Sequence, residues 1–157
     1  MSVEVEIPGG PKLNIEHLVL DYNGTLALDG YLAEGVASRI SALGERLTIH
    51  VLTADTFGRA RAELGNVRCT LVVLKPGNEH RQKAEYLEQL DPDRCAAVGN
   101  GRNDREMLAQ AALAIAVLGQ EGLASDILAA ADIVVPDPVS APDLFLHPQR
   151  IAATLRS

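Results

Sequence analysis

Three polar residues follow apolar segments of this 157-residue chain where a strand could end. Asp21 ends HLVLD and precedes Tyr-Asn-Gly-Thr, Thr53 ends LTIHVLT, and Asp104 closes GNGRND, which begins where CAAVG ends. Gly24 permits a tight turn whose amides could hold an anion. An aspartate beside bound phosphate suits covalent catalysis through an aspartyl-phosphate. Taken singly, Asp21 and Thr53 could equally form a turn or cap a helix.

Other residues could act on the same phosphoryl group. The Thr53 hydroxyl and the Ala54 amide are hydrogen-bond donors. The cation could be Lys83, which lies in a polar helical segment, or Lys75, which ends TLVVLK. Asp104 could pair with Asp21 around a cation. GNGRND is a poor dinucleotide-binding motif, because an acid at the third glycine position would repel pyrophosphate. A nucleotide-binding α/β domain is therefore the weakest alternative.

Short apolar segments must position these residues. The segments 17–21, 47–53, 70–75, 95–100, 113–118 and 132–136 predict strands, and they alternate with predicted helices at 33–44, 57–65, 79–90, 104–111, 121–130 and 141–155. Residues 3–7 could add an edge strand. Several strands are apolar throughout, which is typical of a parallel sheet covered on both faces. We predict an α/β fold, a three-layer doubly wound parallel sheet whose strand ends meet at a ligand-binding edge.

Length and composition limit the alternatives. The chain suits a single domain over residues 1–157. Its net charge of −7 argues against nucleic acid as a partner. No apolar run approaches the length of a membrane span, and no signal peptide is evident. Cys69 and Cys95 lie in apolar segments without a metal-type spacing, so we expect buried thiols and a cytoplasmic protein.

Together, Asp-x-Asn-Gly-Thr, LTAD, a helical lysine and GNGRND resemble the four motifs of the haloacid dehalogenase (HAD) superfamily in order and spacing, over nearly the full chain. LTAD is similar to the Thr-Gly-Asp element of P-type ATPases, and GNGRND is similar to their Gly-Asp-Gly-x-Asn-Asp loop. HRQKAEYLEQL looks like their lysine-bearing helix, which favours Lys83 over Lys75. The chain thus looks like a soluble, P-type-ATPase-like member without pump segments.

The resemblance implies a role for each matching residue. Asp21 would be the nucleophile and a Mg²⁺ ligand, with the main-chain carbonyl of Asn23 as a second ligand. Thr53 and the Ala54 amide would hold the phosphoryl oxygens, and Lys83 would neutralise them. Asp104 would support the metal directly or through water, and Asn100 stands at the family's other metal-side position. The implied partner is a small phosphorylated substrate.

Two residues depart from the family pattern. Phosphatases of the superfamily usually have a second aspartate, a general acid and base, where this chain has Asn23. An amide cannot shuttle protons at neutral pH, and such assistance typically contributes about 10²–10⁴ in rate. Asn100 replaces the first aspartate of the last motif, although Asp21 and Asp104 still supply the one or two carboxylates that Mg²⁺ usually needs. We expect a slow phosphatase; the alternative is a non-catalytic phosphate-binding or regulatory module.

The spacing leaves no room for a cap domain. Asp21 and Thr53 are separated by 31 residues, and Thr53 and Lys83 by 29. One or two core elements use up each interval, so the lid with which many relatives exclude water is missing. A capless enzyme either takes a large substrate or uses a neighbouring subunit as its lid, and we therefore expect a homo-oligomer.

Overall fold

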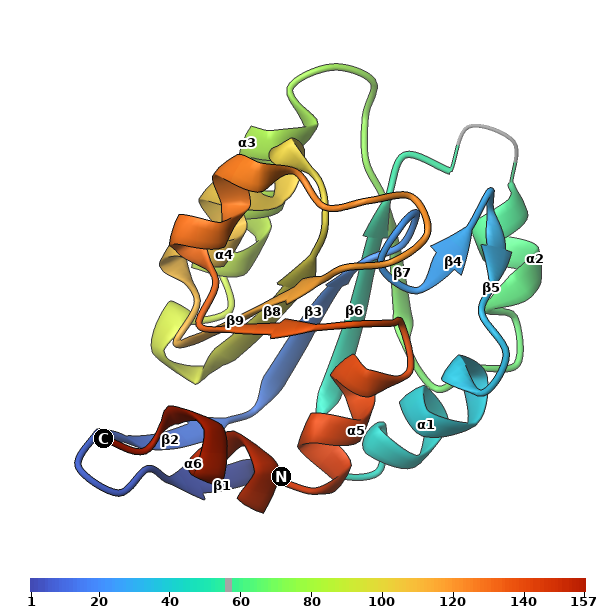
Figure 1. Cartoon of the computed structure of the whole chain (residues 1–157). Helices are drawn as coiled ribbons and strands as arrows, with labels where there is room; N and C mark the ends of the chain where they lie inside the picture. Colours follow the sequence, from blue (N-terminus) through green and yellow to red (C-terminus); the bar gives the residue numbers. More distant parts are fainter. Residues whose placement is uncertain (56–57) are drawn as a thin grey trace.

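A six-stranded parallel sheet forms the centre of the computed structural model, which describes residues 1–55 and 58–157 (Figure 1). The strand order is β10-β9-β8-β3-β6-β7. All six strands lie within the predicted segments, which confirms the predicted parallel sheet. Their bounds are β3 His17–Asp21, β6 Thr48–Thr53, β7 Thr70–Val73, β8 Cys95–Gly99, β9 Leu113–Val117 and β10 Ile133–Val135.

Helices cover both faces of the sheet and make the predicted three layers. α1 (Val36–Leu43) and α5 (Ser140–Leu146) pack together on one side, and α3 (Glu79–Glu88) and α4 (Arg105–Gln110) pack together on the other (Figure 1). The central strand feeds both cores: Leu18 and Leu20 join the hydrophobic cluster on the α1 side, and Val19 joins the cluster on the α3 side. Burial on both faces explains why these strands are apolar throughout.

The N-terminal strand is not an edge strand of this sheet, contrary to the prediction. β1 (Val3–Glu6) pairs antiparallel with β2 (Lys12–Ile15) in a separate two-stranded sheet. Its alternation explains the placement, since Val3 and Val5 are buried while Glu4 and Glu6 are exposed. A strand with one solvent-exposed face suits a small antiparallel sheet better than the parallel sheet, both faces of which are covered by helices.

Three predicted helices are shorter or divided. The expected helix over 141–155 is two helices, α5 and α6 (Gln149–Leu155), because Pro148 cannot continue the hydrogen bonding of a helix interior. Segment 121–130 contains only a 3₁₀ helix at Ser125–Ala130. α2 spans Arg59–Glu63 within the predicted 57–65, and residue 57 lies outside the described residues.

A small hairpin lies between β3 and α1. β4 (Ala27–Leu28) pairs antiparallel with β5 (Tyr31–Leu32), and the connecting Asp29 and Gly30 have φ angles of 53° and 88°. Two consecutive positive φ angles are typical of the type I′ turn, for which Asp-Gly is a strong signal. No cap domain is present in the two described stretches, and no helix in them is long and apolar enough to cross a bilayer.

Candidate active site

The predicted residues meet at the carboxyl edge of the central strands. Asp21 ends β3 and Thr53 ends β6, and these two strands are parallel neighbours with Asp21 opposite Leu52. β8 borders β3 on its other side and leads into a 3₁₀ helix at Arg102–Asp104. Two segments far apart in sequence therefore arrive beside Asp21, which is the arrangement predicted from the strand ends.

A buried lysine joins the two aspartates. Nζ of Lys83, on α3, donates to Oδ1 of Asp21 and to Oδ1 of Asp104, at 2.8 Å each. The Lys83 side chain is only 2% exposed, and Asp104 is fully buried. Lys75 is exposed, and its backbone is bound by the Gln82 side chain. The structure thus brings Lys83, and not Lys75, to Asp21.

Asp104 also organises the loop that carries Asn100. Its Oδ2 accepts hydrogen bonds from the backbone amides of Asn100 and Gly101, at 3.0 Å each. With Oδ1 bound to Lys83, both carboxylate oxygens have protein partners. This arrangement favours an indirect role for Asp104 at a metal.

The Thr25 hydroxyl connects Asp21 to Asn100. Its Oγ1 lies 3.0 Å from Oδ2 of Asp21 and 3.3 Å from Oδ1 of Asn100. Nδ2 of Asn100 donates to the Gly122 carbonyl, which leaves Oδ1 to accept from the Thr25 hydroxyl. Gly24 makes the approach possible: its φ is 78°, and a Cβ there would lie 2.3 Å from Nδ2 of Asn100.

Thr53 and Ala54 lie beside this cluster. The Thr53 side chain is buried, and its Oγ1 accepts a hydrogen bond from the Asp55 amide at 3.2 Å, which leaves the hydroxyl proton for another acceptor. Asp55, rather than Thr53, binds the start of α2, since its carboxylate accepts from the amides of Ala60 and Arg61. Thr53 is therefore not the helix cap that the sequence left open.

Burial and neighbouring charges shift the acid–base behaviour of the cluster. Burial raises the pKa of the Asp21 carboxyl to about 7, and the Asp104 carboxylate adds to the rise, while Lys83 and Thr25 oppose it. Burial alone would lower the pKa of Lys83, but the two carboxylates outweigh it and raise that pKa above 10.5. Lys83 is therefore a fixed cation, whereas Asp21 gains a proton easily unless more positive charge arrives.

A hollow of about 260 Å³ opens onto the cluster. Asp21, Asn23, Thr53, Ala54, Lys83 and Asn100 line it, together with Glu79, Gly101 and Asn103. The structure thus brings six of the seven predicted site residues to one hollow. The seventh, Asp104, does not line the hollow but accepts a hydrogen bond from Lys83, which does. Asn23 is exposed at its mouth.

The donor set fits a hard cation, although it is poor in carboxylates. No group of three or more His, Cys, Asp or Glu side chains that could hold a metal occurs in the described parts of the chain. Asp21 and Asn100 nevertheless both present oxygen atoms to the Thr25 hydroxyl. Mg²⁺ prefers oxygen ligands and often takes one or two carboxylates plus phosphate oxygens of a substrate. The residues present fit such a site.

Three residues of the cluster escaped prediction as site residues. Thr25 is fully buried between Asp21 and Asn100. Asn103 accepts from Nζ of Lys83 at 3.3 Å, and its Nδ2 lies 3.4 Å from the Glu79 carboxylate. Thr25 and Asn103 stand inside the quoted motifs, so their position as polar residues within a motif was the signal. Glu79 carries no such signal.

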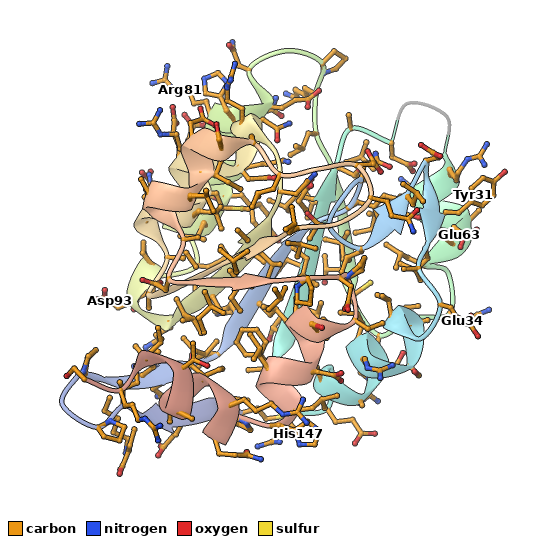
Figure 2. All side chains as sticks on the ribbon, in the orientation of Figure 1. Tyr31, Glu34, Glu63, Arg81, Asp93 and His147 are labelled. Carbon is orange, nitrogen blue, oxygen red and sulfur yellow. The ribbon has the colours of Figure 1, made fainter. Side chains whose placement is uncertain are left out.

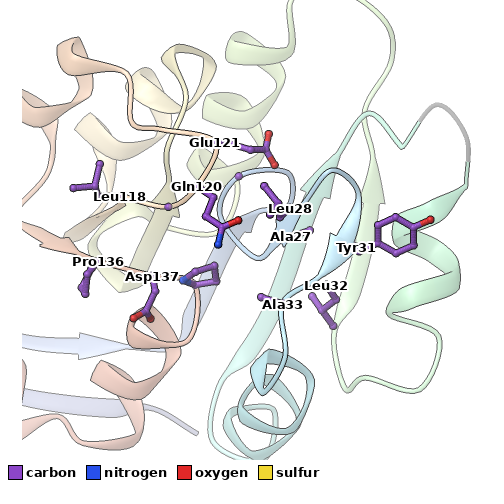
Figure 3. A pocket seen from close by; sticks show the side chains of 13 residues that line it. Ala27, Leu28, Tyr31, Leu32, Ala33, Leu118, Gln120, Glu121, Pro136 and Asp137 are labelled. Carbon is purple, nitrogen blue, oxygen red and sulfur yellow. The ribbon is translucent and has the colours of Figure 1, made fainter.

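A larger hollow of about 630 Å³ lies between the β4–β5 hairpin and the loops that follow β9 and β10 (Figure 3). It is lined largely by apolar side chains, with Gln120, Glu121 and Asp137 among them. None of the seven predicted site residues lines it. The chemistry-bearing residues and this larger hollow are therefore separate.

No protein-family model matches the chain. The uncharacterized protein MJ0073 of Methanocaldococcus jannaschii is 41% identical over 86 residues, which cover 52% of this chain and 92% of that protein. The uncharacterized protein MJ0072 of the same organism is 51% identical over 39 residues, which cover 25% of this chain and 89% of that protein.

Solved structures resemble the chain over most of its length. A 3-deoxy-D-manno-octulosonate 8-phosphate phosphatase from Moraxella catarrhalis, in complex with magnesium ion, phosphate ion and a KDO molecule, has a TM-score of 0.72 at 13% identity, covering 88% of this chain and 90% of that one. A HAD superfamily (subfamily III A) hydrolase from Legionella pneumophila has a TM-score of 0.71 at 16% identity, covering 90% and 87%. The cobalt-bound deoxy-D-mannose-octulosonate 8-phosphate phosphatase from Haemophilus influenzae has 0.70 at 14%, covering 91% and 94%. At these identities the likeness shows the fold.

Proposed function

We propose that this chain, which belongs to the family of the archaeal protein MJ0073 and has the fold of the HAD superfamily, is a Mg²⁺-dependent phosphatase acting through an aspartyl-phosphate at Asp21. The observation that carries the proposal is the placement of Asp21. It ends the central strand, at the foot of a hollow, and a buried lysine that also binds Asp104 donates to its carboxylate. The substrate class is small phosphorylated compounds.

In the first step, one Asp21 carboxylate oxygen attacks the phosphorus and the bond to the leaving oxygen breaks. The Thr53 hydroxyl, the Ala54 amide and the Lys83 ammonium hold the phosphoryl oxygens, on which negative charge is spread. The leaving alkoxide takes a proton from water. In the second step, water attacks the phosphorus of the aspartyl-phosphate, the acyl oxygen departs as the Asp21 carboxylate, and inorganic phosphate leaves.

The chain's own oxygens would hold the cation. We assign the Asp21 carboxylate, the Asn23 main-chain carbonyl and Oδ1 of Asn100 as its ligands, with Asp104 fixing the loop behind them. Mg²⁺ would neutralise phosphate charge at this place. Positive charge next to a carboxyl lowers its pKa, so the raised pKa of Asp21 would return toward that of an ionised nucleophile.

The residue at position 23 determines the turnover rate that we expect. It lines the hollow at the mouth, where an acid could protonate the leaving group and activate water, but an amide can only orient them by hydrogen bonding. We therefore propose a slow enzyme with a long-lived aspartyl-phosphate. Asn23 and Asn100 together also favour the second candidate, a phosphate-binding or regulatory module without turnover.

The test is phosphate release from a panel of phosphomonoesters, measured with Mg²⁺ and again with excess chelator. Wild-type protein should release phosphate only with the metal, and Asp21→Asn should release none, because an amide is a poor nucleophile. If wild type binds phosphate but turns over no ester on a broad panel, the binding module replaces the enzyme. If Asp21→Asn keeps wild-type activity, the nucleophile is another residue.

The remaining expectations are part of the proposal. The functional unit would be residues 1–157 as one domain. A second copy would act as lid over the open hollow, and static light scattering at high concentration tests this, since a monomer would exclude a shared lid. Cys69 and Cys95 are free thiols, which suits the reducing cytoplasm.

A further inference from the structure

A second hollow continues from the candidate active site. It has a volume of about 340 Å³ and lies between the β4–β5 hairpin and α2. Asn23 and Ala54 line both this hollow and the one at Asp21. A phosphate ester whose phosphoryl group lies at Asp21 can therefore extend its leaving group into this space. We name this hollow, lined also by Tyr22, Asp29, Gly30, Asp55, Arg59 and Ala60, the leaving-group hollow.

Arg59 is the cation of this hollow, and an aromatic ring positions it. The carbon of its guanidinium lies 4.3 Å from the centre of the Tyr31 ring. Arginine stacks on aromatic faces in this way and keeps its planar fork of donors free at the edge. The fork matches carboxylate and phosphate geometry, to which it can bind in a bidentate manner.

The hairpin that carries Tyr31 is fixed on several sides. The Tyr22 hydroxyl donates to the Gly30 carbonyl at 2.8 Å, and the Leu32 amide lies 3.3 Å from the Glu63 carboxylate on α2. The Asp29 amide also lies 3.2 Å from the carboxylate of Glu121. Figure 2 shows Tyr31 and Glu63 on the α2 side of the molecule. The ring is therefore a preorganised support for Arg59.

The donors of Arg59 are open among the described residues. Salt bridges there involve other arginines, namely Arg39, Arg81, Arg94 and Arg102, and no described carboxylate lies within 4.0 Å of Arg59. Asp55 shares the hollow, but its two carboxylate oxygens accept from the backbone amides of Ala60 and Arg61. Asp29 is exposed at the hairpin turn. Within residues 1–55 and 58–157, Arg59 is thus a cation without an anionic partner.

We propose that Arg59, supported by Tyr31, binds a second anionic group on the substrate. The preferred substrates are then phosphate esters whose leaving group carries a carboxylate or another phosphate. This inference rests on the proposed phosphatase function and narrows its substrate class. Arg59 does not line the hollow at Asp21, so its role is specificity, expressed mainly in KM for esters that carry the second anion.

Matched ester pairs test the inference. Phosphoglycolate is compared with 2-hydroxyethyl phosphate, and fructose 1,6-bisphosphate with fructose 6-phosphate, each with wild type and with Arg59→Ala, Arg59→Lys and Tyr31→Leu. Wild type should prefer the doubly anionic member by about ten-fold in kcat/KM, the size expected for one charge-assisted hydrogen-bonded pair. Arg59→Ala should abolish the preference, and Arg59→Lys and Tyr31→Leu should reduce it. The two pairs distinguish carboxylate from phosphate.

Arg61→Ala is the matched control, because it removes the same charge from an exposed position on α2 that does not line the hollow. p-Nitrophenyl phosphate, which lacks a second anion, measures basal activity, and wild type and Arg61→Ala should hydrolyse it equally. Equal preference in wild type and Arg59→Ala, or equal effects of Arg59→Ala and Arg61→Ala, overturns the inference while leaving the phosphatase intact. If no ester is hydrolysed, the proposed phosphatase function is overturned. Calorimetry then measures the binding of the same ester pairs to wild type, and equal affinities for the two members of each pair overturn the role of Arg59.

Discussion

Nζ of Lys83 lies 2.8 Å from Oδ1 of Asp21, although 62 positions separate the two residues in the chain. Because Lys83 also binds Asp104, Lys83→Met leaves two buried carboxylates without their cation. We expect the free energy of unfolding to fall by about 3–5 kcal/mol, as when one partner of a buried ion pair is removed. Denaturant unfolding measures it, with exposed Lys75→Met as a control that should change it by less than about 0.5 kcal/mol.

The pH dependence of that loss has a definite sign. A carboxyl whose folded pKa is raised, as Asp21's is, binds more protons in the folded state, so stability falls as pH rises from about 4 to about 7. Removing the ammonium raises this pKa further. The loss in the free energy of unfolding caused by Lys83→Met should therefore be larger at pH 8 than at pH 5. A constant deficit would mean that lost packing, and not charge, causes it.

Restoring an acid at the mouth of the hollow should speed turnover. Asn23→Asp should raise the rate of Mg²⁺-dependent phosphate release by about ten-fold or more, given the usual size of general acid–base catalysis. The variant should fold normally, since Asn23 is exposed and the change is nearly isosteric. Asn66→Asp adds the same charge at an exposed position outside the hollow and should leave the rate unchanged. A slower Asn23→Asp would contradict the proposed role of this position.

A carboxylate at position 100 should strengthen the metal site at a cost in stability without metal. Asn100→Asp removes the bond from Nδ2 to the Gly122 carbonyl and adds a third acid near Asp21 and Asp104. We expect the metal-free variant to be less stable by about 1–3 kcal/mol. Its affinity for Mg²⁺ should rise by about ten-fold, the scale on which single groups tune metal sites.

Thermal unfolding over a magnesium titration provides the readout for position 100, since a ligand that binds the folded state raises the melting temperature. The rise should be larger for Asn100→Asp than for wild type. Asn66→Asp again serves as the charge control. Equal magnesium-induced shifts in all three proteins would remove Asn100 from the metal site.

A buried histidine should make the fold sensitive to mild acid. Nε2 of His50 lies 3.1 Å from Nδ1 of His17, and its Nδ1 lies 2.8 Å from the Tyr86 hydroxyl. Burial first, and then the charge of His17, lowers the pKa of His50 to about 4. The unfolded chain then binds the proton more readily, so stability is complete above about pH 6.5 and is lost as pH falls toward 4.

The histidine contribution should reach about 3 kcal/mol at pH 4, from the difference between the two pKa values. Carboxylates also weaken the fold in this range, so the measured quantity is the difference between wild type and His50→Gln. Denaturant unfolding at pH 7 and pH 4 should show a flatter dependence for His50→Gln. Exposed His147→Gln should follow wild type (Figure 2). Parallel curves for wild type and His50→Gln would show that His50 does not titrate.

The strand ends could be predicted from sequence because burial on both faces leaves a plain mark. Asp21 is the first polar side chain after the apolar residues 18–20, Thr53 ends a strand that is buried from residue 49 onward, and the sheet places both at its carboxyl edge. The sequence favoured Lys83 over Lys75 but did not decide between them, because the answer depends on which turn of α3 faces the strand ends. That orientation is a matter of packing between distant segments.

Other features left a weaker signal or none. The role of Thr25 depends on a loop 75 positions away that brings Asn100 within 3.3 Å. The β4–β5 hairpin had its Asp-Gly signal, but two-residue strands are too short to show alternation. The pairing of β1 with β2 instead of the main sheet could not be predicted. An alternating segment indicates a strand with one buried and one solvent-exposed face, but it does not specify the partner strand.

β3 is hydrogen-bonded on both sides, to β8 and to β6. The strand that carries Asp21 can therefore shift only if two ladders open, and the backbone amides of β3 should exchange with solvent as slowly as global unfolding allows. Arg59 and Tyr31, by contrast, stand on a five-residue helix and a two-residue strand, which open at a smaller cost in free energy. Substitutions around the leaving-group hollow can thus accumulate and redirect substrate choice, while the phosphoryl chemistry stays anchored in the most protected part of the fold.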